Sequence, residues 1–292
     1  MREFRFVADG ELAGKEILTV LTSILGCSSN IVSKLKQGEY ILVNGKQENV
    51  RYRLLGNDEL LIKIPSEKSE NIVSNSSVSF GILYEDEDIL VVDKPSGIPT
   101  HPSIHHYGDT LANGVMAYIN DEDFTFRAVN RLDSETSGIV LIAKNMLSAH
   151  ILSKAVADRK IEKIYRAITV GVPTDDKGEI IAPIAREMES IITRCVRDDG
   201  QYAHTEFEVL KKGDGIALLE VRPITGRTHQ IRVHFSHIGY PLFGDALYGE
   251  KIEGERTRLH CYKMRFYHPI TKELIEIVSE LPEDFKKLID LS

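Results

Sequence analysis

The sequence lacks long apolar runs and has few cysteines. No stretch of about 18 apolar residues appears in it, which argues against a membrane span, and its first residues lack the apolar core of a signal peptide. Cys27, Cys195 and Cys261 lie far apart and form no CxxC pair, so a disulfide framework is not expected. We therefore expect a globular protein of the reducing cytoplasm.

The motifs of common cofactor sites are also absent. There is no GxxxxGK[ST] loop and no GxGxxG after a strand, so sites for nucleoside triphosphates and dinucleotides are unsupported. Among the histidines from 229 to 237, only His234 and His237 could chelate together from one helical face. No cysteine or carboxylate joins them at ligand spacing. We expect neither a metal nor a cofactor.

An excess of basic residues is lacking as well. The formal net charge is −8, which by itself argues mildly against a nucleic-acid partner. The bases are unevenly distributed, however, because residues 222–265 hold eight Lys/Arg and four Asp/Glu. Residues 144–166 hold six Lys/Arg and two Asp/Glu, whereas acids crowd at 85–88. This distribution permits a basic cleft on an acidic body, but bases scattered over solvated faces would give the same counts.

The first 65 residues have the pattern of a small α/β domain. Ser28 or Ser29 can cap a helix that ends near Gly38, and Asn44-Gly45 predicts a hairpin turn after a short strand. An earlier helix is predicted from apolar residues at helical spacing: Ile17, Val20, Leu21, Ile24 and Leu25. A later strand is predicted from the run ELLIKIP. Residues 66–77, SEKSENIVSNSS, are polar and serine-rich, which is typical of a linker.

Residues 78–292 alternate irregularly between predicted strands and helices. Asp109, Asn145 and Thr228 can each cap a helix, while short apolar runs such as ILVVDKP and IVLIAK predict strands. The helices are too few and too irregularly placed for a doubly wound parallel sheet. We therefore predict an α+β fold with a large mixed, mainly antiparallel sheet flanked by helices.

The segment AVNRLDSETSGIVLIAKN, residues 128–145, carries the densest polar signal. Asp133 stands where a strand-like approach meets a polar turn, and a buried strand leaves that turn. A carboxylate at such a junction can be fixed by rigid neighbours and still face a cleft. The residues alone fit a turn-forming aspartate at least as well as a catalytic one.

NRLDSETSG resembles the HRLD-x-x-TSG signature of the RluA/RluD family of RNA pseudouridine synthases, with Asn130 in place of the usual histidine. Three further blocks resemble that family in the same order: LYEDEDILVVDKPSGIPTHPS (83–103), KIYRAITVG (163–171) and RPITGRTHQIRVHFSHIGYPLFGDALYG (222–249). The likeness covers nearly all of residues 78–282. It implies a pseudouridine synthase catalytic domain over residues 78–292.

The resemblance also implies roles for individual residues. Asp133 would be the catalytic carboxylate, Arg232 its salt-bridge partner, and Tyr165 the residue that stacks on the target base or handles its proton. The expected RNA-binding residues are Arg131, Arg227, His229 and Asn130. The alternatives are a core position for Tyr165, a structural ion pair for Arg131 and an exposed helical arginine at 232.

Residues 1–65 resemble an S-four-type RNA-binding domain, through the helix–helix–LVNG pattern and the later turn before ELLI. Together the likenesses imply an isomerase that converts uridines in RNA to pseudouridine. The expected substrate is large-subunit ribosomal RNA, with transfer RNA as the alternative, and a monomer is expected. A non-catalytic RNA-binding factor and a hydrolytic glycosylase remain as other hypotheses, which product analysis would separate.

Overall fold

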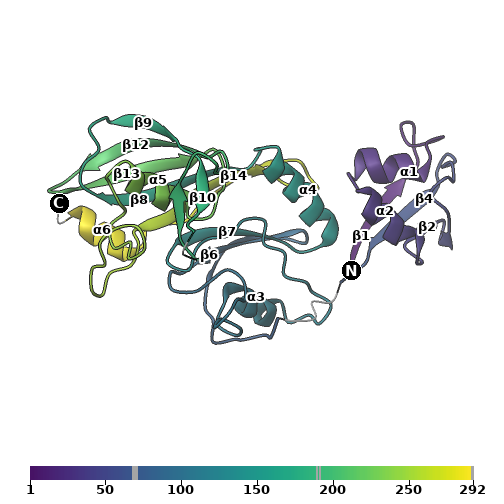
Figure 1. Ribbon diagram of the computed structural model, residues 1–292. Helices are drawn as coiled ribbons and strands as arrows, with labels where there is room; N and C mark the ends of the chain where they lie inside the picture. Colours follow the sequence, from purple (N-terminus) through teal and green to yellow (C-terminus); the bar gives the residue numbers. More distant parts are fainter. Residues whose placement is uncertain (68–71, 189, 191, 291–292) are drawn as a thin grey trace.

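The chain folds around two separate β-sheets in the computed structural model, which describes residues 1–67, 72–188, 190 and 192–290. In Figure 1 the small N-terminal sheet and its helices lie at the right, and the larger sheet lies at the left. Within the described ranges, no helix combines the length and apolar character that crossing a bilayer requires.

The N-terminal domain is a four-stranded antiparallel sheet covered by short helices. The strands are β1 (Arg2–Val7), β2 (Ile41–Val43), β3 (Lys46–Gln47) and β4 (Glu59–Ile64), in the order β1-β4-β2-β3. The helices are α1 (Ile17–Thr19), the π-helical η1 (Val20–Ile24) and α2 (Ser29–Lys36). Ser28 caps α2 by accepting from the Ile31 N–H at 3.3 Å. Asn44 and Gly45 have φ of 50° and 78°, which confirms the predicted hairpin turn.

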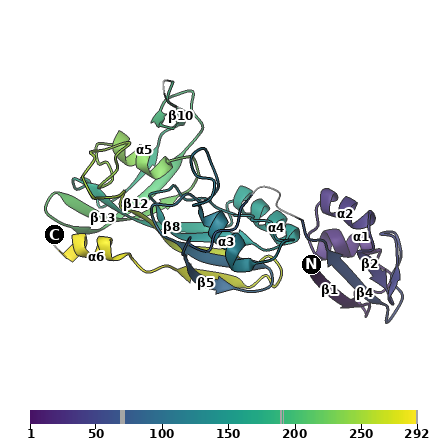
Figure 2. The same cartoon turned by 90° about the horizontal axis from the view of Figure 1, so that it is seen from below.

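The second sheet has nine strands and is almost entirely antiparallel, which confirms the predicted fold class. Its order is β5-β6-β7-β14-β8-β13-β12-β9, with β15 paired to β14, and among the described strands only the β7–β14 pairing is parallel. The strands are β5 (Gly81–Glu85), β6 (Ile89–Lys94), β7 (Ser137–Ala143), β8 (Glu162–Val170), β9 (Lys177–Ile181), β12 (His204–Lys212), β13 (Ile216–Pro223), β14 (Leu259–Tyr267) and β15 (Leu274–Val278). A separate hairpin of β10 (Ile184–Arg186) and β11 (Arg194–Val196) projects from this body (Figure 2).

The parallel contact between β7 and β14 depends on a glycine. Gly138 has φ of 109°, and a Cβ atom there would lie 2.4 Å from the backbone oxygen of Cys261. A side chain would therefore push β14 away from β7. The close approach aligns the start of β7 with Tyr165 and Arg166 of β8, across the intervening strand β14.

Four helices accompany the large sheet: α3 (Leu111–Ile119), α4 (Met146–Ala157), α5 (Gln230–His237) and α6 (Glu283–Asp290). Asn145 caps α4 as predicted, but the predicted caps Asp109 and Thr228 are wrong. The N-cap of α3 is Thr110, which forms a reciprocal capping box with Asn113. The N-cap of α5 is His229, and the Gln230 side chain accepts from the Arg227 N–H at 3.0 Å.

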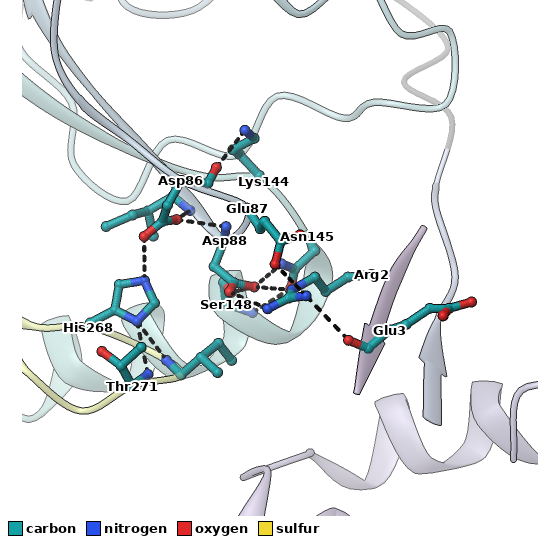
Figure 3. A network of polar contacts seen from close by, with 12 residues as sticks. Arg2, Glu3, Asp86, Glu87, Asp88, Lys144, Asn145, Ser148, His268 and Thr271 are labelled. Carbon is teal, nitrogen blue, oxygen red and sulfur yellow. Dashed lines mark hydrogen bonds and ion pairs between the residues drawn. The ribbon is translucent and has the colours of Figure 1, made fainter. Parts of the chain in front are cut away.

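The two domains meet along α4. Met146 and Leu147, at the start of this helix, belong to the same apolar cluster as the N-terminal core. Beside this contact, Arg2 of β1 donates to both carboxylate oxygens of Asp88, at 3.2 and 3.1 Å (Figure 3). Asn145 donates to the same carboxylate at 2.8 Å. The N-terminal domain thus rests on a helix whose opposite end reaches the site described below.

Candidate active site

The loop that carries Asp133 is fixed from both sides by the segment that follows β6. The Thr100 hydroxyl accepts from the Leu132 N–H at 3.1 Å and donates to the Leu132 carbonyl at 2.9 Å. The Ser134 carbonyl accepts from the Gly97 N–H at 2.9 Å. Asp133 lies between these two anchored residues, and its side chain keeps 29% of its exposure. The carboxylate is therefore held in place and still faces solvent.

Lys94 lies beneath this loop and is entirely buried. Its ammonium donates to the carbonyls of Pro95 at 2.8 Å, Ile98 at 2.8 Å and Ser134 at 3.1 Å. Burial lowers the pKa of Lys94 to about 7, and the Asp133 carboxylate opposes that shift. Lys94 lies in the block that precedes the signature, but the sequence pattern does not mark it as part of the site, because its burial depends on distant segments.

Arg232, on α5, lies between two carboxylates. Its Nη1 is 3.5 Å from Asp133 Oδ2, while its Nε and Nη2 each donate to an oxygen of Asp245 at 2.7 Å. Burial alone would lower the pKa of Arg232, but the hydrogen bonds and charge of Asp245 raise it, with a further contribution from Asp133. Asp245 thus fixes the guanidinium so that its third nitrogen points to Asp133.

His229 approaches Asp133 from the turn before α5. Its φ is 58°, which is uncommon for a residue with a Cβ, and its Nε2 lies 3.8 Å from Asp133 Oδ1. The Tyr248 hydroxyl accepts from the Arg194 N–H at 2.9 Å and lies 2.7 Å from His229 Nδ1. Burial lowers the pKa of His229, and Asp133 opposes this. With the imidazole neutral and the Tyr248 hydroxyl donating to Nδ1, the ring proton is on Nε2, facing Asp133.

Tyr165 lies in the middle of the large sheet, on β8, opposite Val221 of β13 and Cys261 of β14. Its side chain is buried but still lines the cavity in front of Asp133. Burial raises the pKa of Tyr165 well above its usual value, and the neighbouring Cys261 and Asp133 add to the shift. The ring therefore presents a neutral phenol and an aromatic surface.

All seven residues singled out from the sequence line one cavity of about 620 Å³, a size typical of ligand sites. Arg131 is exposed at this cavity and forms no ion pair with any residue that the structure describes. The Arg227 guanidinium donates to the Tyr202 carbonyl and the Gln201 side chain. The amide of Asn130 is engaged with β7, at the backbone of Ile139 and Leu141. Among the described residues that line the cavity, Asp133 is the sole carboxylate.

One group of described residues, Asp86, Asp88 and His268, has the spacing of a metal site. His268 Nδ1 accepts from the N–H groups of Ile270 and Thr271 at 3.2 and 3.0 Å. In this arrangement its proton is on Nε2, 2.9 Å from Asp86, and a metal would have to displace that proton. His234 also has both nitrogens engaged, with Thr205 and the Ala182 carbonyl.

Comparison with known proteins points in one direction. A family model described as RNA pseudouridylate synthase matches residues 88–237. The RNA pseudouridine synthase YjbO of Bacillus subtilis is 38% identical over 269 residues, which cover 91% of this chain and 95% of that protein. The ribosomal large subunit pseudouridine synthase D of Pseudomonas aeruginosa is 38% identical over 231 residues, which cover 73% of this chain and 72% of that protein.

The solved structure of human RNA pseudouridylate synthase domain containing 1 has a similar fold. It superposes with a TM-score of 0.61 at 27% sequence identity, over 72% of this chain and 87% of that chain. The likeness thus extends from local sequence blocks to the arrangement of the catalytic sheet.

Proposed function

This chain belongs to the RNA pseudouridylate synthase family, and from that premise we propose that Asp133 is the catalytic carboxylate of an enzyme acting on large-subunit ribosomal RNA. The protein is an RNA pseudouridine synthase, an isomerase that converts uridine in RNA to pseudouridine. The observation that supports the role of Asp133 is its isolation as the sole acid of its cavity among the described residues, held against Arg232 and His229.

The reaction rearranges bonds without gaining or losing atoms. The bond from the sugar carbon C1′ to uracil N1 breaks, the base turns, and C5 forms a bond to the same C1′. C5 loses its proton and N1 ends protonated, so the reaction needs no redox partner. A carboxylate must act at the sugar, either by attack on C1′ or by removal of a neighbouring sugar proton that gives a glycal.

The cavity contains the groups that these steps require. Arg232 and the Nε2–H of His229 both face Asp133, so they would stabilise its anionic form before the substrate arrives. Tyr165 offers a ring against which a flipped uracil would stack, which contributes about 1–3 kcal/mol per base. Arg131 and Arg227, both exposed, would bind phosphates beside the extruded nucleotide.

The two other hypotheses fit this cavity less well. Hydrolysis of a glycosidic bond ordinarily uses two carboxyl groups, whereas Asp133 is the sole one among the described residues that line the cavity. A purely RNA-binding factor would not need a carboxylate held beside a buried arginine. The isomerase therefore accounts for more of the observed contacts than either alternative.

The test is to incubate ribosomal RNA from cells that lack this protein with the wild type or with Asp133→Asn. Pseudouridines are mapped by carbodiimide labelling and reverse-transcription stops, with no metal or cofactor added. We expect new stops with the wild type and a loss of at least about 10⁴-fold in single-turnover rate with Asp133→Asn, because a catalytic group acting at the sugar is removed.

The control is RNA affinity, which should change less than about threefold, since Asn keeps the shape of Asp and phosphate contacts dominate binding. Normal turnover by Asp133→Asn would show that another group does the chemistry. Stops that appear on transfer RNA but not on ribosomal RNA would support the catalytic role of Asp133 and reject ribosomal RNA as the substrate.

We also propose that residues 1–65 bind RNA, and that the protein acts as a monomer in the cytoplasm. The resemblance to an S-four-type domain supports the first. The free state of Cys27, Cys195 and Cys261 is compatible with a reducing compartment. Light scattering of the purified protein with and without RNA would test the monomer, and a mass near twice 32.8 kDa would reject it.

A further inference from the structure

Two buried or partly buried lysines near Asp133 differ in what surrounds their ammonium groups. Lys94 donates to three carbonyls, so its charge is satisfied within the protein. Lys163 forms no ion pair and no side-chain hydrogen bond with any residue that the structure describes. A cation removed from water without a partner is unfavourable, and burial lowers the pKa of Lys163 accordingly. An anion from outside would remove that cost.

Lys163 is among the residues that line the Asp133 cavity. It lies on β8 two residues before Tyr165, so both side chains leave the same face of the strand. Its Nζ is 3.9 Å from where a Cβ on Gly226 would lie, in the loop between β13 and α5. Lys163 lines this cavity and also a second one of about 690 Å³.

We call this second cavity the backbone groove. It continues from the first, with which it shares eight lining residues: Val129, Asn130, Val156, Lys163, Pro223, Thr225, Gly226 and Arg227. Its other described walls are the turn after α4 and the end of β13, and its bases are Arg159, Lys160, Lys163, Arg222 and Arg227. The groove is thus markedly basic in a chain of net charge −8.

The one described acid that lines the backbone groove is already engaged. Glu162 lies 3.1 Å from Arg222 and 3.5 Å from Arg265, so it leaves Lys163 and Arg159 without a carboxylate. No aromatic side chain lines the groove among the described residues. A groove with cations and no stacking surface suits a phosphate backbone better than exposed bases.

We infer that the backbone groove binds the RNA strand next to the target uridine, and that the Lys163 ammonium contacts the phosphate nearest the Asp133 cavity. The inference rests on the proposed function and extends it to a specific backbone contact. Because the groove opens directly into the cavity, a strand lying in it delivers its next nucleotide to Asp133. The contact is independent of base sequence, since it involves only phosphate oxygens.

The test compares wild type with Lys163→Met, which keeps a similar stem without the charge. RNA affinity is measured against salt concentration, and the single-turnover rate is measured at saturating RNA. We expect about tenfold weaker binding at 0.1 M salt and a log–log salt slope smaller in magnitude by about 0.7–0.9, the value for one phosphate contact. The saturated rate should stay within about twofold, since Lys163 would position RNA but take no part in the chemistry.

A set of modified RNAs identifies the phosphate that Lys163 contacts. RNAs that carry a single neutral methylphosphonate at successive linkages beside the target are bound to both proteins. One linkage should weaken the wild type about tenfold and leave Lys163→Met unchanged, because the lost charges belong to one pair. Lys163→Arg should restore the salt slope. Lys177→Met, on β9 with its partner Glu208 2.9 Å away, is the control and should leave the slope unchanged.

An unchanged salt slope in Lys163→Met, or equal weakening by every neutral linkage, would overturn the inference. Turnover by the wild type in the same reactions tests the proposed function separately, so the two failures can be told apart. If Lys163→Met does not fold, Arg159→Met replaces it, since Arg159 lies on the exposed turn after α4. An unchanged slope in that variant rejects the groove.

Discussion

The Asp133 cavity and the backbone groove share a wall, yet the groups beside Asp133 and two of the cations in the groove are held in opposite ways. In the cavity, Arg232 has two carboxylate partners and His229 has Tyr248 and Asp133. In the groove, Lys163 and Arg159 have no carboxylate partner among the described residues. Arg232 and His229 thus have protein partners without RNA, whereas a phosphate would supply the partner that Lys163 and Arg159 lack.

This difference fits the roles proposed for the two regions. Groups that stabilise a transition state act best when they are oriented beforehand, because no reorganisation is then needed during reaction. Groups that bind a polyanion gain affinity by exchanging counterions for phosphates, which requires free cations. The comparison therefore predicts that variants in the cavity change the rate, whereas variants in the groove change affinity and its salt dependence.

After Asp133→Asn, the largest effect should come from Asp245→Asn, which tests whether the groups beside Asp133 are oriented in advance. Arg232 would lose the bidentate partner that orients it, and the single-turnover rate should fall about 100-fold, comparable to loss of one transition-state donor. RNA affinity should change little. The exposed pair of Asp199 with Arg197 supplies the control, since Asp199→Asn should leave both quantities unchanged. A fall in affinity with a normal rate would reverse the roles assigned to the two regions.

A smaller effect, about tenfold in rate, is expected when the Nε2–H of His229 is lost. Gln places an amide N–H near the position of Nε2, whereas Asn reaches only as far as Nδ1. His229→Gln should therefore keep most of the single-turnover rate, and His229→Asn should show the tenfold fall. The backbone predicts the opposite order, because Asn tolerates the φ of 58° better than Gln does. A better rate with Asn would mean that His229 serves the turn and not Asp133.

Much of the fold could be predicted because its signals are local. Asn44-Gly45 predicts its hairpin from two residues, and Ser28 and Asn145 cap the helices that follow them. The wrong caps show the limit of such signals. Asp109 is engaged with His106 at 2.7 Å, so the neighbouring Thr110 caps α3 instead. Which of two suitable residues caps a helix depends on contacts that the sequence pattern does not contain.

The residues predicted for the candidate site lie together in one cavity, but the residues that hold them in place were not predicted. Resemblance supplied Asp133, Tyr165 and Arg232, all of which line one cavity. Lys94 and Asp245 could not be found in the same way, since each acts through contacts set by the folded chain. Lys94 reaches a carbonyl 40 residues away, and Asp245 holds an arginine on the preceding helix. That Lys163 has no ion-pair partner among the described residues is likewise visible only in three dimensions.

The smallest effect should come from a substitution at the junction of the two domains, where a partly buried ion pair joins the N-terminal domain to the catalytic domain. Arg2 and Asp88 form a pair between domains, with 24% and 4% of their side chains exposed. Arg2→Ala should lower the free energy of unfolding by about 1–2 kcal/mol, since Asp88 keeps Asn145 as a partner. If the N-terminal domain holds RNA toward the groove, KM should rise about two- to threefold with kcat unchanged. Arg5→Ala, on the same strand with a largely exposed partner, should change neither quantity. A fall in kcat with Arg2→Ala would instead show that α4, which runs from this junction to Val156 at the cavity wall, transmits the position of the N-terminal domain to Asp133.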